Sequence, residues 1–192
     1  MNIMYFGSEY GGWHLDTSLI SDKSIIWSAG VGTDISFDLT LMGHTNVTIH
    51  AFDPTPRCLK WLAGQTLPKT FIMHEYGISN TDGIKRFEFP EKEEYVSFKE
   101  SESKGIPTIE LPVKKVSTIM KALNHDKIDV LKMDIEGSEY AVIDELLSNK
   151  ILPIQLLVEF HTPAKDNEYI NKLQTEYNWI CQNNRDFNFV KK

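Results

Sequence analysis

The chain has 192 residues and a formal net charge of −7, with 41% hydrophobic and 24% charged residues. This length suits one domain that buries a core without disulfide or metal staples, so we expect a single domain over residues 1–192. The negative charge argues against a general nucleic-acid binder, which needs a basic surface to neutralise phosphates. No apolar run is long enough to span a membrane, so neither nucleic acid nor a membrane is an expected partner.

The N-terminal segment differs from a secretory leader, because residues 1–13 lack a basic stretch followed by an apolar one. We therefore expect a cytoplasmic protein. Residues 1–23 precede the first predicted strand as an N-terminal arm or lid. Its aromatic, glycine-containing stretch from Glu9 to Trp13 has two interpretations: a lid over a site, or a surface arm that packs Trp13 on the sheet.

Short β-branched runs alternate with helical patterns along the chain, which is typical of a parallel sheet covered by helices. The alternation predicts an α/β fold with a doubly wound, mostly parallel sheet. The predicted main strands are residues 24–28, 47–52, 70–73, 128–133 and 154–160, and the predicted covering helices are residues 34–42, 56–63, 116–123 and 138–147.

Residues 82–112 break this rhythm. A turn at residues 81–83 precedes an alternating segment, and an acidic, serine-rich piece follows at residues 91–105. These patterns predict a short hairpin and a mobile loop, inserted between the third and fourth main strands.

The C-terminal region predicts one more helix and a hairpin. The helix is expected over residues 168–177, and two short strands over residues 179–182 and 187–190, joined by a turn-prone Asn-Asn-Arg-Asp stretch. An antiparallel hairpin here would close the sheet.

A glycine turn follows the first predicted strand, in the run from Ser28 to Asp34 (SAGVGTD). Gly30 and Gly32 let the backbone turn sharply and approach a ligand closely, and Asp34 can cap the next helix. A Gly-x-Gly alone fits a tight turn without a ligand nearly as well.

Support for a ligand comes from Asp53, at the end of the second predicted strand and about twenty residues after Gly32. A carboxylate at this edge of a doubly wound sheet can accept both hydroxyls of a ribose. The other interpretation of Asp53 is a turn former before Pro54.

The choice of cofactor lies between a nicotinamide dinucleotide and S-adenosylmethionine, since both contain a ribose. A dinucleotide needs a third small residue in Gly-x-Gly-x-x-Gly, where this chain has Ile35, and a second nucleotide-binding half. S-adenosylmethionine carries no phosphate and needs only one half. The sequence therefore favours a methyltransferase over a nicotinamide oxidoreductase.

Three motifs resemble the FkbM family of S-adenosylmethionine-dependent methyltransferases, over roughly residues 24–161. They are Asp-Pro-Thr-Pro at residues 53–56, the Lys-x-Asp-x-Glu-Gly-x-Glu run at residues 132–139, and Glu-Phe-His at residues 159–161. The resemblance implies a Rossmann-like, seven-stranded methyltransferase sheet and usually O-methylation of sugars or natural-product hydroxyls.

The resemblance also implies cofactor contacts from Gly30, Gly32, Asp53 and Pro54. Methyltransferases of this broad class commonly have an acid where this chain has Ser28, and many family members have a further glycine where it has Asp34. Asp34 could supply the missing carboxylate to the methionine part of the cofactor.

The adenine is expected just after the third strand. There Tyr76 could pack on the ring and the backbone of Gly77 could come close. Tyr76 is equally well explained as an ordinary core residue.

Four titratable residues are expected to meet at the edge of the fourth and fifth strands, which are neighbours in the methyltransferase strand order. Asp134 and Glu136 follow the fourth strand, and Glu159 and His161 end the fifth. Because alternate strand residues share a face, Asp134 and Glu136 should point the same way. Such clusters often mark functional sites.

Each of the four has an expected role in methyl transfer to a hydroxyl. His161 is the first candidate for the general base, because its ordinary pKa of about 6.5 suits work near neutral pH. Asp134 is expected at the methionine ammonium, and Glu136 or Glu159 at the acceptor's hydroxyls. The same set could bind a divalent metal that acidifies the hydroxyl, although a metal-free site is favoured.

The sequence thus predicts an S-adenosylmethionine-dependent O-methyltransferase acting on a sugar or small-molecule hydroxyl. The alternative is a non-catalytic module that keeps the fold, and with it the cofactor site, and assists another enzyme. The short chain and the altered glycine motif motivate this alternative. The acceptor itself is not identified by any motif.

Overall fold

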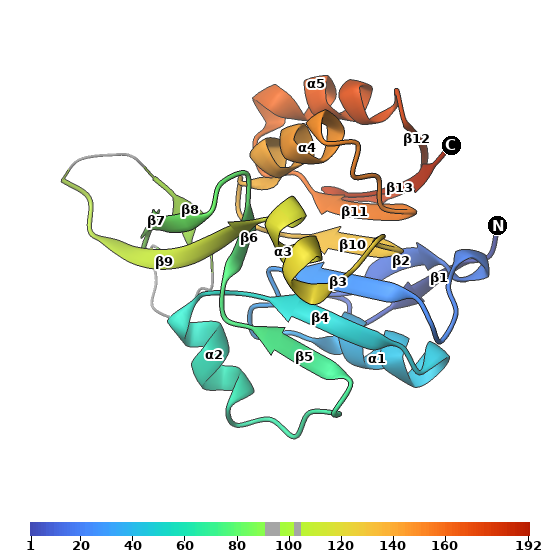
Figure 1. The fold of residues 1–192 in the computed structure, drawn as a ribbon, viewed down its shortest axis with the longest axis horizontal. Helices are drawn as coiled ribbons and strands as arrows, with labels where there is room; N and C mark the ends of the chain where they lie inside the picture. Colours follow the sequence, from blue (N-terminus) through green and yellow to red (C-terminus); the bar gives the residue numbers. More distant parts are fainter. Residues whose placement is uncertain (91–96, 102–104) are drawn as a thin grey trace.

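A seven-stranded sheet forms the centre of the molecule in the computed structural model, which describes residues 1–90, 97–101 and 105–192 (Figure 1). The mixed α/β class expected from the sequence is confirmed. In spatial order the strands are β12 (Tyr177–Asn183), β13 (Asp186–Lys191), β11 (Gln155–Glu159), β10 (Val130–Met133), β3 (Ile25–Ala29), β4 (Thr48–Phe52) and β5 (Phe71–His74).

Five neighbouring strands, from β11 to β5, run parallel to one another. The strand β13 pairs antiparallel with both β11 and β12, so the expected C-terminal hairpin is present. Each of the five parallel strands agrees with its predicted run to within two residues at either end. The carboxyl ends of β3, β4, β10 and β11 consequently meet at one edge of the sheet.

Helices cover both faces of this sheet. Because side chains alternate along a strand, Ile26 and Trp27 of β3 belong to two separate hydrophobic cores. One face carries α1 (Ser36–Thr45) and α2 (Pro56–Leu62), and the other carries α3 (Val116–Leu123), α4 (Glu139–Ser148) and α5 (Pro163–Leu173). Among the described residues, no helix combines the length and the apolarity needed to cross a lipid bilayer.

Residues 1–23 form an antiparallel hairpin, β1 (Ile3–Phe6) and β2 (Trp13–Asp16), followed by the short 3-10 helix η1 (Thr17–Leu19). The backbone N–H of Asp16 donates to the side-chain oxygen of Gln155 on β11 over 2.9 Å. The side-chain amide nitrogen of Gln155 donates in return to the carbonyl of Asp16 over 3.0 Å. Trp13 is buried in the core with α1. The arm thus packs Trp13 on the sheet, and its role as a lid stays a prediction.

The region between β5 and α3 is a second, four-stranded sheet, where a hairpin and a loop were expected. Its strands, in spatial order, are β6 (Gly77–Ser79), β9 (Thr108–Lys115), β7 (Gly83–Glu88) and β8 (Lys99–Glu100). The sequence pattern missed β9, because Pro112 and two lysines interrupt it. Pairing with β6 on one side and β7 on the other stabilises β9 instead. The mobile loop predicted for residues 91–105 falls largely outside the described residues.

The last helix starts and ends earlier than the predicted residues 168–177. Pro163 occupies the first turn of α5, where its missing N–H costs nothing. Tyr177 belongs to β12 and is buried in the core under α3, α4 and α5.

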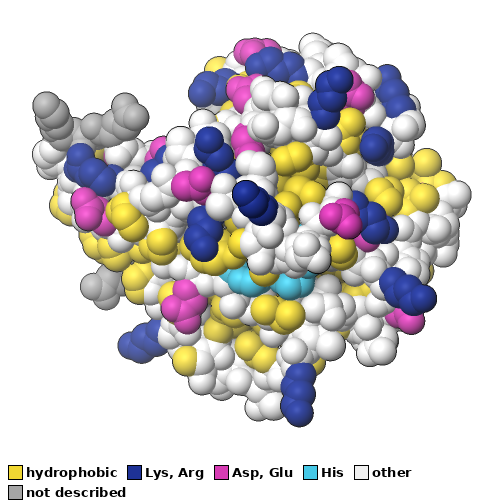
Figure 2. Space-filling model, in the orientation of Figure 1, with side chains coloured by type: hydrophobic (Ala, Val, Ile, Leu, Met, Phe, Trp, Pro, Cys, Tyr) yellow, Lys and Arg dark blue, Asp and Glu magenta, His cyan; other side chains and the backbone are white. Residues whose placement is uncertain are grey.

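Three histidines lie together on the sheet face that carries α3, and Figure 2 shows histidine side chains gathered in the middle of this side of the molecule. The Nδ1 atom of His50 is 2.9 Å from Nε2 of His74, and the ring of His50 packs edge-on against His125. The indole N–H of Trp27 donates to Nδ1 of His125. Burial, together with the other two histidines, lowers the pKa of His50 to about 4.

We predict that His50 weakens the fold in acid. Its pKa falls from 6.5 in the unfolded chain to about 4 in the folded one, so the unfolded chain binds more protons in between. The contribution of neutral His50 is therefore complete above pH 6.5 and is lost as the pH falls toward 4. Because the ring keeps some contact with water, we expect a loss of roughly 1 kcal/mol.

Urea unfolding from pH 7.5 to 4.5, within the range proteins usually tolerate, measures this loss. The His50→Asn variant should lose less free energy of unfolding than the wild type over this window, and the exposed-site control His44→Asn should follow the wild type. Equal slopes for wild type and His50→Asn would contradict the prediction.

Candidate active site

A cleft of about 850 Å³ opens at the carboxyl edge of the main sheet. The loops after β3, β4, β10 and β11 line it, together with the N-terminal arm, the second sheet and the turn between β12 and β13. Its volume lies in the upper part of the range for small-molecule sites. The predicted site residues in its lining are Gly30, Gly32, Asp34, Asp53, Pro54, Gly77, Asp134, Glu136, Glu159 and His161.

The glycine turn after β3 is shaped by a close contact with the loop after β10. Gly30 has a φ of +72°, and a Cβ atom added to it would lie 1.6 Å from the carbonyl oxygen of Asp134. The Nζ atom of Lys132 donates to the carbonyl of Gly30 over 3.0 Å. Gly30 is therefore required for packing the two loops together, whether or not a ligand is bound.

Ser28 lies behind this turn, in the strand β3. Its side chain is fully buried in β3 and is not in the cleft lining. Lys132, which pairs with Ser28 across the parallel strands, does line the cleft and is 5% exposed. Sequence reasoning missed Lys132, because a lysine in a strand is usually solvated.

Asp53 ties the ends of β3 and β4 together. One carboxylate oxygen accepts the backbone N–H of Gly32 at 3.0 Å, and the other accepts both the N–H and the hydroxyl of Thr55. The thiol of Cys58 also hydrogen-bonds to this carboxylate. Pro54 continues this wall, and its ring lies against the backbone of Gly77.

Asp34 joins the glycine turn to the N-terminal arm. Its carboxylate accepts the N–H of Ser36 at the start of α1, over 2.8 Å, and the hydroxyl of Ser8, over 2.6 Å. Burial raises the pKa of Asp34, but these hydrogen bonds outweigh it and lower the pKa overall.

Tyr76 lies outside the cleft lining, unlike the neighbouring Gly77. Its ring packs beside Phe52 and His74, and the Nζ atom of Lys114 lies 4.1 Å from its centre. Tyr76 thus contacts the core under α3, α4 and α5. This position does not support an adenine contact and matches the interpretation of a core residue.

Asp134 and Glu136 both enter the cleft, for a different reason from the one expected. The strand β10 ends at Met133, so strand alternation cannot align the two side chains. Glu136 has a φ of +56° and Gly137 one of +103°. This left-handed backbone, which costs about 1 kcal/mol at a residue with a Cβ, aims Glu136 into the cleft.

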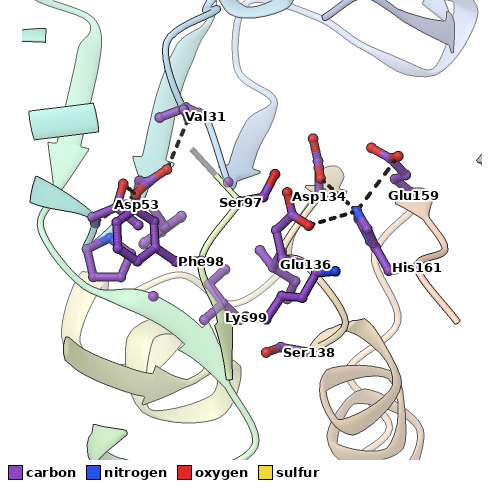
Figure 3. Close-up of a pocket in the computed structure, with 18 of the residues that line it drawn as sticks. Val31, Asp53, Ser97, Phe98, Lys99, Asp134, Glu136, Ser138, Glu159 and His161 are labelled. Carbon is purple, nitrogen blue, oxygen red and sulfur yellow. Dashed lines mark hydrogen bonds and ion pairs between the residues drawn. The ribbon is translucent and has the colours of Figure 1, made fainter. Parts of the chain in front are cut away.

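His161 lies at the centre of three carboxylates, which point toward its ring in Figure 3. Its Nε2 atom is 3.6 Å from Asp134, 3.5 Å from Glu136 and 3.7 Å from Glu159. These distances are longer than hydrogen bonds between charged groups. The side chain of His161 is only 10% exposed.

Glu139 holds the other side of this ring and was not among the predicted site residues. It is completely buried at the start of α4, and its carboxylate lies 2.9 Å from Nδ1 of His161. The backbone N–H groups of Ile135 and Gly137 also donate to it. The sequence signal for this role was the last acid of the Lys-x-Asp-x-Glu-Gly-x-Glu run.

The charges of this cluster change the protonation of its members. Burial alone would lower the pKa of His161, but the hydrogen bond to Glu139 and the nearby carboxylates raise it to about 9. Burial and the charge of Asp134 raise the pKa of Glu159 to about 7. A raised pKa favours the imidazolium form, which has no lone pair for an incoming proton, so the role of His161 as general base stays a prediction.

Comparison with known proteins identifies the family. The sequence model described as methyltransferase FkbM domain matches residues 20–188. The chain belongs to the FkbM methyltransferase family. It is 26% identical to probable methyltransferase-like protein 24 of Rattus norvegicus over 149 residues, which cover 71% of this chain and 32% of that protein.

The protein of the same description from Homo sapiens is also 26% identical, over 138 residues, with the same shares of 71% and 32%. The FkbM chain therefore spans about a third of the length of the curated relatives it matches. No solved structure matches it.

Other parts of this FkbM chain contribute to the cleft without having been predicted to do so. The turn after β12 supplies Asn184, Arg185 and Asp186, which the sequence indicated only as a turn. Residues of β7 and β8, and their neighbours on both sides of the gap in the described chain, also line the cleft. They are Phe87, Glu88, Phe89, Pro90, Ser97, Phe98, Lys99 and Glu100.

We predict that Gly30→Ala destabilises the protein by more than about 3 kcal/mol, because the new Cβ meets the Asp134 carbonyl and the backbone is left-handed. The control is Gly43→Ala in α1, where an added Cβ has no neighbour within 4 Å. That change should be neutral or stabilising by up to about 1 kcal/mol. Chemical unfolding measures both, and similar stabilities for the two variants would contradict the prediction.

Proposed function

We propose that this FkbM protein is an S-adenosylmethionine-dependent methyltransferase that methylates a hydroxyl oxygen of a sugar or another small molecule. One observation carries the proposal: the glycine turn and the cluster of carboxylates around His161 line the same cleft. The doubly wound arrangement also supports it, with parallel strands in the order β5-β4-β3-β10-β11 and helices on both faces. Ligands of such sheets bind outside the carboxyl ends of the strands.

The cofactor end of the cleft fits S-adenosylmethionine better than a dinucleotide. Ile35 stands where a dinucleotide site needs a glycine, and its side chain is buried in the core with α1. Asp53 lines the cleft beside Gly32, where we assign it a ribose hydroxyl, and Pro54 with Gly77 offers an apolar wall for a flat ring. When bound, the cofactor supplies a methyl group on a positively charged sulfur.

The methionine ammonium of this cofactor needs a carboxylate close to the glycine turn. Asp34 already accepts hydrogen bonds on both of its oxygens. Asp134 is 33% exposed and its backbone touches Gly30, so we assign the ammonium to Asp134, through the carboxylate oxygen that does not face His161.

The acceptor end carries groups for hydroxyls and for an apolar surface. Glu136 and Glu159 direct carboxylate oxygens into the cleft, where they can accept hydrogen bonds from hydroxyls and receive a proton. The rings of Phe89 and Phe98, 5.9 Å apart, line the same cleft from the second sheet. An aromatic face beside carboxylates is suited to a sugar or a flat polyhydroxyl molecule.

We expect the purified protein to give saturable heat with S-adenosylhomocysteine in titration calorimetry and none with a nicotinamide dinucleotide. Asp53→Asn should weaken the affinity at least about tenfold, since it replaces one acceptor oxygen by a donor and disturbs the tie to Gly32. The exposed Asp126→Asn serves as control and should bind like the wild type. Saturable binding of the dinucleotide alone would refute the proposal.

Transfer of a labelled methyl group to a panel of sugars, polyols and catechols tests the reaction itself. Glu159→Gln should lower turnover by about a hundredfold or more and leave cofactor affinity within a few-fold. The exposed Glu75→Gln, outside the cleft lining, should behave like the wild type. Cofactor binding without transfer to any acceptor would instead favour the non-catalytic module.

A further inference from the structure

The Nε2 atom of His161 is directed at a point where several negatively charged ligand atoms converge. One oxygen each of Asp134 and Glu136 and one nitrogen of His161 all lie within 4.8 Å of one another. Glu159 approaches the same nitrogen to 3.7 Å. Charge-assisted hydrogen bonds close to about 2.7–2.9 Å, so Nε2 makes none of them despite three carboxylate neighbours.

The ring of His161 is fixed from behind, so this spacing is built into the fold. Its Nδ1 atom lies 2.9 Å from Glu139, whose carboxylate is held in turn by the N–H groups of Ile135 and Gly137. A carboxylate behind a histidine is the usual support of a metal-binding imidazole, because it orients the ring and leaves the other nitrogen for the metal.

The distances match the size of a shared ion. Two ligand atoms that each lie about 2.1 Å from one cation are roughly 3 to 3.5 Å apart. The distances of 3.5 and 3.6 Å from Nε2 to Glu136 and Asp134 need only a small inward shift.

We propose that His161, Asp134 and Glu136 bind a divalent cation at the acceptor end of the cleft, with Glu159 beside it. One imidazole and two or three carboxylates suit Mn²⁺ best, with Zn²⁺ as the next choice. Binding releases the Nε2 proton to solvent. All three residues line the cleft, so a ligand hydroxyl could reach a cation held between them.

The catalytic consequence rests on the proposed function. A hydroxyl bound to the cation loses its proton more easily, and Glu159 can take that proton. The resulting oxygen attacks the methyl carbon, the carbon–sulfur bond breaks, and its electron pair stays on sulfur to give a neutral thioether. The cation thus takes over the activation that was first expected from His161.

Titration of the metal-free full chain with Mn²⁺, followed by electron paramagnetic resonance and calorimetry, tests the site. We expect one saturable site below about 1 mM, with affinity at least tenfold lower in Glu136→Gln and in His161→Gln. Glu88→Gln is the matched control, because it removes a carboxylate that lines the cleft outside the cluster. Its affinity for Mn²⁺ should equal that of the wild type.

Two results would overturn the inference: no saturable Mn²⁺ or Zn²⁺ binding, or equal Mn²⁺ affinity in wild type and Glu136→Gln. Glu136 lies in a turn and is 21% exposed, so this variant should fold even if His161→Gln does not. Binding of S-adenosylhomocysteine is measured on the same samples. Mn²⁺ binding without cofactor binding would support the cation site and refute the methyltransferase proposal. Methyl transfer that EDTA does not affect, in a chain that binds no Mn²⁺, would support the methyltransferase proposal and refute the cation site.

Discussion

The contact between Gly30 and the carbonyl of Asp134 determines the geometry of the whole cleft. Only a residue without a Cβ lets the loops after β3 and β10 approach this closely, and the Lys132 ammonium bonded to the Gly30 carbonyl strengthens the junction. The glycine turn and the carboxylate cluster are thereby held at a fixed separation. A two-substrate reaction needs such a separation, because the reacting atoms must meet in line.

A second constraint is the surplus of negative charge at one end of the cleft. Asp134, Glu136 and Glu159 surround one imidazole, and the nearby Asp186 has a pKa raised to about 6 by burial and by the charge of Asp134. Carboxylates kept this close are stable only beside positive charge. Besides the imidazole ring of His161, the guanidinium of Arg185 lies 4.0 Å from Glu159, and a cation shared by the carboxylates would add to this balance.

Much of the fold could be predicted from the sequence, because the buried parallel strands are continuous apolar runs and their carboxyl ends must share an edge. The same reasoning correctly predicted that Asp134 and Glu136 lie near Glu159 and His161. It could not predict β9, which depends on partners on both sides, or the left-handed backbone at Glu136. The contact of buried Glu139 with His161 could not be predicted either, because an acid at a helix start usually faces water.

The two hydrogen bonds between Asp16 and Gln155 constrain the order in which the parts of the fold come together. These bonds join residues 139 positions apart, so the arm that contributes Tyr10 and Trp13 to the cleft cannot complete its contacts with the sheet until β11 has been synthesised. Contacts of such long range close late, since the entropy of the intervening chain must be lost first. The earliest part of this chain to leave the ribosome is thus among the last to take its place in the cleft.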